Sequence, residues 1–218
     1  MIDATTMAGS FKAACVAAKG PDYCTDKVVQ VLMAVSRHET CFSGCKPFLG
    51  VNNFGAIQCG VVADKTGKCP GGCIPARDTS PTSTGASVSY LACFEARPSA
   101  ESGVRRFVEL MTVKRPLIAN ALPSGDALQI AWAMRKSYYF EGFGKTQEER
   151  VNNYAAAIAR NAQLNAAQLR VTNQITYQPP PPPEPPPVDG DMLAGGVLTV
   201  AALWAGMRAR ILSTPETP

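Results

Sequence analysis

Eight of the nine residues from Pro179 to Pro187 are proline, and this run constrains the fold more than any other feature of the sequence. Proline has no backbone N–H donor and a fixed φ, so the run cannot belong to a helix interior or a central strand. It favours a polyproline II spacer about 28 Å long. We therefore predict a globular domain over residues 1–177, a linker over 178–190, an apolar segment over 191–212 and a short tail over 213–218.

The segment after the linker has the composition of a membrane-spanning helix. Residues 192–207 carry no charge, Asp189 and Asp191 precede them, and Arg208 and Arg210 follow them. A spanning helix needs about 20 residues, so the two arginines would have to reach the interface with their long side chains. The charge asymmetry places the tail in the cytoplasm and the globular domain outside. The alternative is a buried C-terminal helix that packs on the domain or on a partner protein.

The first 177 residues show the signals of a mostly helical domain with one irregular lobe. Between Cys41 and Phe94, Gly, Pro, Ser and Thr dominate, and residues 88–94 alternate like a short strand. Outside that lobe, apolar residues recur at helical spacing. The expected helices lie in residues 3–19 and after capping residues at Thr25 or Asp26, Ser99, Ser124 and Thr146. This pattern predicts a mostly helical α+β domain.

Glu39 occupies an unusual place for an acidic residue. Counting back along its helix gives Val35, Leu32 and Val28, at spacings of four, three and four residues, so its carboxyl group lies on the apolar face. Desolvation and the negative end of the helix dipole both raise the pKa of a carboxyl group there. A carboxyl that stays protonated near neutral pH can protonate a glycosidic oxygen. The alternative is a frayed helix end, with Glu39 pointing into water.

Two stretches around this glutamate carry a resemblance to a known family. They are SRHETCF over residues 36–42 and GVNNFGAIQ over residues 50–58. A glutamate that ends a buried helix, followed by an NNFG loop, resembles the lysozyme-like superfamily of peptidoglycan-cleaving glycosidases, and most closely the endo-β-N-acetylglucosaminidases of glycoside hydrolase family 73. Residues 89–111 and 138–144 are similar to later segments of the family, the latter to its phage-type members.

The resemblance implies roles for individual residues. Glu39 would be the general acid, and Asp78 the second carboxylate, with Asp64 as the alternative. Tyr139, or Tyr138 beside it, matches a tyrosine near the groove. The residues expected to contact the glycan are Asn52, Asn53, Phe54 and Gln58, together with His38, which lies about 100° around the helix from Glu39 and is expected at the groove edge.

The eight cysteines, with none after Cys93, favour a disulfide-stapled lobe whose pairing the sequence leaves open. The spacing of Cys41 and Cys45, and of Cys69 and Cys73, also permits a four-thiolate zinc site. Disulfides would place the domain in an oxidising, extracytoplasmic setting. The N-terminal residues lack the positive charge and the apolar run of a cleavable signal peptide, so the C-terminal segment or a virion would have to deliver the domain.

The sequence thus predicts a mostly helical, lysozyme-like α+β domain with a small cysteine-rich β-lobe, followed by a polyproline linker and a C-terminal transmembrane helix. We expect a muralytic enzyme that cuts β-1,4 linkages of peptidoglycan, either membrane-anchored with its catalytic domain extracytoplasmic or carried by a virion, such as a bacteriophage. Its partners would be glycan strands, the membrane, and virion or envelope proteins.

Apart from the zinc alternative for the cysteines, we expect no metal, no other cofactor and no nucleic acid, because His38 is the only histidine and the net charge is only +4. Direct hydrolysis and lytic transglycosylation both stay open. The alternative function is a non-catalytic peptidoglycan-binding or structural module of a virion or envelope machine.

Overall fold

The computed structural model describes residues 4–81, 87–140, 142 and 144–181. The chain divides into two units, Met1–Pro179 and Pro180–Pro218, and the first is described below. The predicted membrane segment and tail, and the linker after Pro181, lie outside the described residues. Within the described ranges, no helix combines the length and the apolar composition needed to cross a bilayer.

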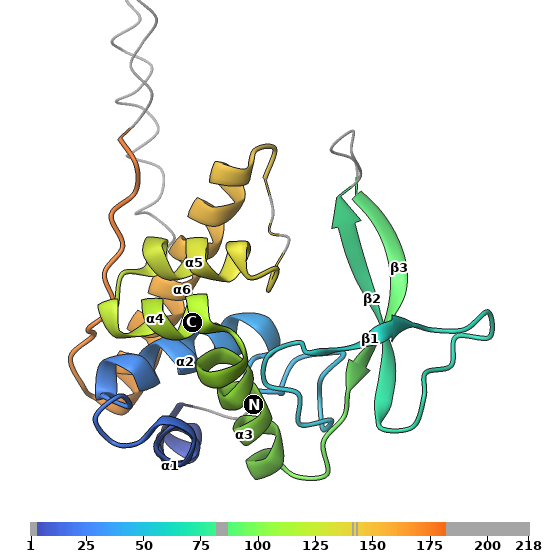
Figure 1. The fold of residues 1–218 in the computed structure, drawn as a ribbon, viewed down its shortest axis with the longest axis horizontal. Coiled ribbons are helices and arrows are strands. Elements are labelled where there is room, and N and C mark those ends of the chain that lie inside the picture. Colours follow the sequence, from blue (N-terminus) through green and yellow to red (C-terminus); the bar gives the residue numbers. More distant parts are fainter. Residues whose placement is uncertain (1–3, 82–86, 141, 143, 182–218) are drawn as a thin grey trace, which may run out of the picture. The chain divides into compact units, whose positions relative to one another are not determined.

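The first unit consists of helices with a small sheet to one side (Figure 1). Its helices are α1 (Ala4–Lys19), α2 (Asp26–Thr40), α3 (Ala100–Glu109), α4 (Pro116–Ala121), α5 (Ala127–Lys136) and α6 (Gln147–Leu169), with a π-helical turn η1 (Leu110–Lys114) and a 3-10 turn η2 (Leu122–Ser124). The sheet holds β1 (Gln58–Val62), β2 (Cys73–Pro81) and β3 (Ser87–Glu95). The mostly helical α+β class is therefore confirmed.

Helix α2 lies at the centre of the helical part and packs against α1 and α6. Thr25 caps it by accepting a hydrogen bond from the Val28 N–H. Every residue from Val28 to Ser36 is buried, so the helix is enclosed on all sides and not only along one apolar stripe. The helix ends at Cys41, whose left-handed backbone stops the helical hydrogen bonding. The last turn of α2 therefore leaves the core and carries Glu39 to its edge.

The later helices begin largely where their caps were expected. Ser99 caps α3 and Thr146 caps α6 through a capping box with Glu149. The helix that Ser99 caps is α-helical as far as Glu109 and continues as the π-helical turn η1. Ser124 was expected to open the next helix. It lies instead in η2, and Asp126 caps α5 by accepting from the N–H groups of residues 128 and 129.

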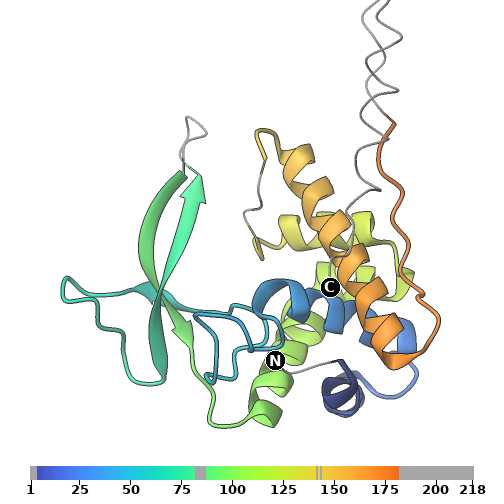
Figure 2. The same cartoon turned by 180° about the vertical axis from the view of Figure 1, so that it is seen from behind.

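The β-lobe is an antiparallel sheet in the order β1-β3-β2, and β3 contains the strand predicted over residues 88–94. Its own buried cluster is small and separate from the helical core, with Phe48, Ala76, Ala92 and Phe94 as members. A view from behind shows the loop after α2 leading across from the helices to the sheet (Figure 2). A lobe with so small a core needs further constraints to hold its shape.

Disulfides supply those constraints, as predicted. The four pairs are Cys15–Cys24, Cys41–Cys45, Cys59–Cys73 and Cys69–Cys93. The last two tie the strands and turns of the β-lobe together, and the second closes the loop directly after α2. The zinc alternative for Cys41, Cys45, Cys69 and Cys73 was wrong, since all four thiols are used in disulfides.

Candidate active site

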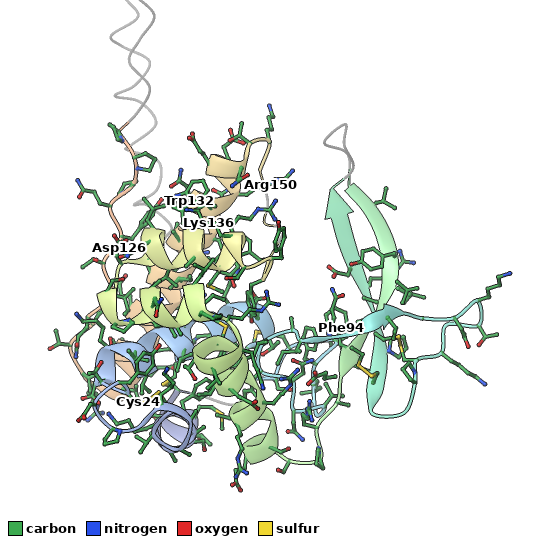
Figure 3. The ribbon with its side chains drawn as sticks, viewed as in Figure 1. Cys24, Phe94, Asp126, Trp132, Lys136 and Arg150 are labelled. Carbon is green, nitrogen blue, oxygen red and sulfur yellow. A yellow bond between two sulfur atoms is a disulfide. The ribbon has the colours of Figure 1, made fainter. Side chains whose placement is uncertain are left out.

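A groove with a volume of about 1250 Å³ lies where the last turn of α2, the loop before β1, the sheet and the first turns of α6 meet. Its lining residues include Phe94 on β3 and Arg150 on α6, which Figure 3 shows on the sheet side and the helical side respectively. Among the predicted site residues, His38, Glu39, Gln58, Asp78, Tyr138 and Tyr139 line the groove. The groove therefore collects residues from segments far apart in the sequence.

Glu39 lies half-buried in the groove wall, in the last turn of α2. The pKa of its carboxyl group is raised from the ordinary 4.5 to about 7, mainly by burial. A hydrogen bond from Tyr154 works against this rise in the pKa, and the negative charge of Asp78 adds to it. The side chain thus exists in both protonation states near neutral pH, as a group that gives up and regains a proton in one reaction cycle requires.

Tyr154, on α6, holds the Glu39 carboxyl through a hydrogen bond from its hydroxyl to Oε1. Its ring stacks on Phe140 with 3.9 Å between centroids, and His38 meets it edge-on at 4.9 Å. Packing on both sides fixes the ring, so the donor has one position relative to Glu39. Tyr154 occupies a buried position of α6, and no sequence pattern marks it as a site residue.

Of the two candidates for the second acid, Asp78, on β2, is the one that lines the groove together with Glu39. Its Oδ2 accepts hydrogen bonds from Gln58 Nε2 at 2.5 Å and from the Tyr90 hydroxyl at 3.2 Å. Asp64, the alternative second acid, does not line the groove. It accepts hydrogen bonds from Thr66 and from the backbone N–H of residue 68 in the turn after β1.

The NNFG loop, residues 52–55, supports the groove through hydrogen bonds and core packing. Asn53 is 2% exposed and its side chain is fully used, donating to the carbonyls of Ile57 and Glu95 and accepting from the N–H groups of residues 55 and 57. Phe54 is buried in the main core, and Asn52 donates to the carbonyl of residue 97. These three side chains were expected to contact the glycan, but the structure places them in the support of the loop and not in the groove lining.

Tyr139 ties this loop to the helical part of the groove. Its hydroxyl donates to the carbonyl of Gly55 at 2.9 Å, and burial together with the negative charge of Glu39 raises its pKa. Gly55 leaves no room for a side chain, since a Cβ there would lie 2.3 Å from the ring of Phe107. Tyr138, in contrast, is 86% exposed. Of the two tyrosines, Tyr139 is the one bound to the loop.

Hydrolytic chemistry at this site would depend on the two carboxyl groups. Within the described part of the chain, no cluster of three or more His, Cys, Asp or Glu side chains could hold a metal ion. A partly protonated carboxyl and a second carboxylate that affects its pKa form an acid–base arrangement across one groove. Such an arrangement can protonate a leaving oxygen and accept a proton from an attacking hydroxyl.

No family model and no curated protein matches the chain. Among solved structures it is similar to a peptidoglycan hydrolase mutant from Sphingomonas sp. A1, with 19% identity, a TM-score of 0.48, and coverage of 74% of this chain and 92% of that one. It is also similar to the catalytic domain of the autolysin Auto from Listeria monocytogenes, with 12% identity, a TM-score of 0.44, and coverage of 73% and 84%. At this level of similarity, function has to be inferred from the groove residues.

Proposed function

We propose that this chain is a glycosidase that cuts the β-1,4-linked glycan of peptidoglycan, with Glu39 as the general acid. The observation that supports it best is a carboxyl group with a pKa of about 7 that lines a groove of about 1250 Å³ and shares it with the Asp78 carboxylate. The HET…NNFG pattern around this carboxyl, which resembles family 73 glucosaminidases, supports peptidoglycan as the substrate. A membrane anchor or a virion as the means of delivery is a further part of the proposal.

In the proposed reaction, Glu39 donates its proton to the glycosidic oxygen as the bond from that oxygen to the anomeric carbon breaks. A water molecule then bonds to the anomeric carbon and gives up a proton to the Asp78 carboxylate. Gln58 and Tyr90 hold Asp78 in place, and Tyr154 stabilises the Glu39 carboxylate left behind. Proton exchange with solvent restores both groups for the next cycle.

The test is mass spectrometry of fragments released from purified peptidoglycan by the oxidised full-length protein, beside a folded Glu39→Gln variant. Reducing-end N-acetylglucosamine would identify a glucosaminidase, reducing-end N-acetylmuramic acid a lysozyme, and anhydro-muramic ends a lytic transglycosylase. In each case the variant should release nothing. If the wild-type protein binds the wall and releases no fragments, the proposal is wrong and a non-catalytic wall-binding module takes its place.

A further inference from the structure

The groove carries more positive than negative side chains. Its lining includes the acids Glu39, Asp78 and Glu149, and the bases Arg77, Arg106, Arg115, Lys145 and Arg150. Glu39 carries only part of its negative charge near neutral pH, because its pKa is about 7. The net positive charge of such a lining would not attract a neutral polysaccharide, whereas it would attract an anionic one.

Two of these bases are already engaged within the protein. Arg106 forms an ion pair with Glu95 at 3.0 Å, and Arg150 donates to the carbonyl of Gly144 at 2.8 Å. Arg77 and Arg115 form no ion pair with any carboxylate in the described ranges. They enter the groove from different elements, Arg77 from β2 and Arg115 from the helical side, directly after η1.

Arg115 is the more informative of the two because it is half-buried. A guanidinium group loses hydration when it is buried, and a carboxylate partner is what normally compensates for that loss. Arg115 lies close enough to Tyr139 for its charge to act on the tyrosine hydroxyl, which binds the NNFG loop. Its charge is therefore held beside the groove loop, where a bound sugar strand would pass.

We propose that Arg115, assisted by Arg77, binds carboxylates carried by the glycan, so that the groove selects an anionic strand over a neutral one of the same linkage. This inference rests on the proposed glycosidase function and adds a residue that determines specificity. The planar guanidinium group can bind both oxygens of a carboxylate at once. In peptidoglycan the carboxylate has two sources, the lactyl group of muramic acid when it carries no peptide, and the stem peptide when one is attached.

The experiment measures binding by calorimetry to the full-length Glu39→Gln variant, which keeps the groove and does not consume the ligand. Three β-1,4 oligosaccharides of equal length are compared: a neutral N-acetylglucosamine oligomer, an alternating oligomer with free lactyl carboxylates, and the same oligomer bearing stem peptides. We expect at least one anionic oligomer to bind about tenfold more tightly than the neutral one, with the advantage weakening in salt. Whichever of the two anionic oligomers binds more tightly identifies the source of the carboxylate.

The advantage should disappear when Arg115→Gln is added, while the affinity for the neutral oligomer stays the same, and Arg115→Lys should keep part of it. Arg105→Gln is the matched control, because Arg105 is exposed on α3, pairs with Glu101 and lies outside the groove lining. Arg77→Gln provides a second test should Arg115→Gln unfold the protein, which thermal melting would reveal.

Three outcomes overturn the inference. Equal affinity for all three oligomers, or an equal loss for all three on Arg115→Gln, would show that the arginine does not select charge. Turnover of peptidoglycan by the wild-type protein alongside either result would leave the glycosidase function standing. Failure of every oligomer to bind, together with no turnover, would contradict both.

Discussion

The hydroxyl of Tyr154 donates a hydrogen bond to Oε1 of Glu39 and so connects α6 with the end of α2. The two residues are 115 positions apart in the chain. A donor aimed at a carboxylate stabilises the charged form, and here it acts against burial, which favours the protonated form. The pKa of Glu39 therefore depends on contacts from two helices and on the charge of Asp78 on the sheet.

Removing this donor should shift the pH dependence of activity upward. Tyr154→Phe takes away an interaction that lowers the pKa of Glu39, so the general acid stays protonated to higher pH. We expect the alkaline limb of kcat/KM to move up by about one pH unit, measured on purified peptidoglycan. Tyr177→Phe is the control, because its hydroxyl binds the carbonyl of Asn152 and lies outside the groove lining. If the alkaline limb of Tyr154→Phe stays where it is in the wild-type protein, Glu39 is not the group whose titration sets that limb.

Removing the charge of Asp78 should have the opposite effect on that limb. Asp78 raises the pKa of Glu39, so Asp78→Asn should move the alkaline limb to lower pH. If Asp78 also accepts the proton of the attacking water, kcat should fall by about 100-fold or more. Asp64→Asn changes an acid of the same lobe outside the groove lining and should leave both quantities unchanged. A small fall in kcat would favour attack by a hydroxyl of the sugar itself.

Burial of Glu39 should also appear as a pH-dependent stability. Its folded pKa of about 7 lies above the ordinary 4.5, so the folded state holds the proton more tightly than the unfolded chain. The contribution of the Glu39 proton to the unfolding free energy is complete below about pH 4.5 and is lost as the pH rises through about 7. Relative to Glu39→Gln, the wild-type protein should lose about 2 kcal/mol of unfolding free energy between about pH 5 and about pH 8.

Denaturant unfolding of both proteins at the two pH values measures this difference, because the titration of all other groups cancels. Glu101→Gln, which alters an exposed acid on α3, should show no such trend. A pH-independent difference between wild type and Glu39→Gln would mean that the carboxyl is not desolvated in the folded protein.

Removing individual disulfides should affect stability and activity to different extents. Cys69–Cys93 spans 24 residues of sequence and Cys41–Cys45 only 4, so replacing each pair by serine should cost about 3 kcal/mol and about 2 kcal/mol respectively. Loss of Cys41–Cys45 should reduce activity more than loss of Cys69–Cys93, because the loop that it closes directly follows Glu39 and contains Ser43. The Ser43 hydroxyl donates to the Phe48 carbonyl and accepts from the N–H of Asn53. Denaturant unfolding and kcat of the two double variants, measured on the folded fraction, test both orders.

The parts of this molecule that were predictable from sequence are those determined locally. The spacing that places Glu39 on the buried side of its helix, and the Thr146 cap of α6, depend on neighbours within a few residues. The boundary before α5 was missed because Ser124 and Asp126 are both good caps, and only the backbone course of η2 decides between them.

The rest depended on contacts between distant segments. Asparagine at a predicted sugar-binding loop suggested ligand contacts, yet the backbone groups around Asn53 occupy its side chain completely. Tyr154 sits at an apolar position of its helix and showed no functional signal until its hydroxyl was placed beside Glu39. Disulfide pairing was open for the same reason, because it depends on which strands of the β-lobe meet.

All four covalent bridges lie at or before Cys93, and the helices from α3 onward contain none within the described residues. The loop next to Glu39 and the lobe that carries Asp78 are thus each bridged within themselves, whereas the segments that supply Tyr139 and Tyr154 are held by noncovalent packing alone. In a partial unfolding of the molecule, the helices from α3 onward, which carry no disulfide, would detach first. Glu39 would then lose Tyr154, whereas Asp78 would keep Tyr90 on the bridged sheet, and activity would vanish well before the β-lobe unfolds.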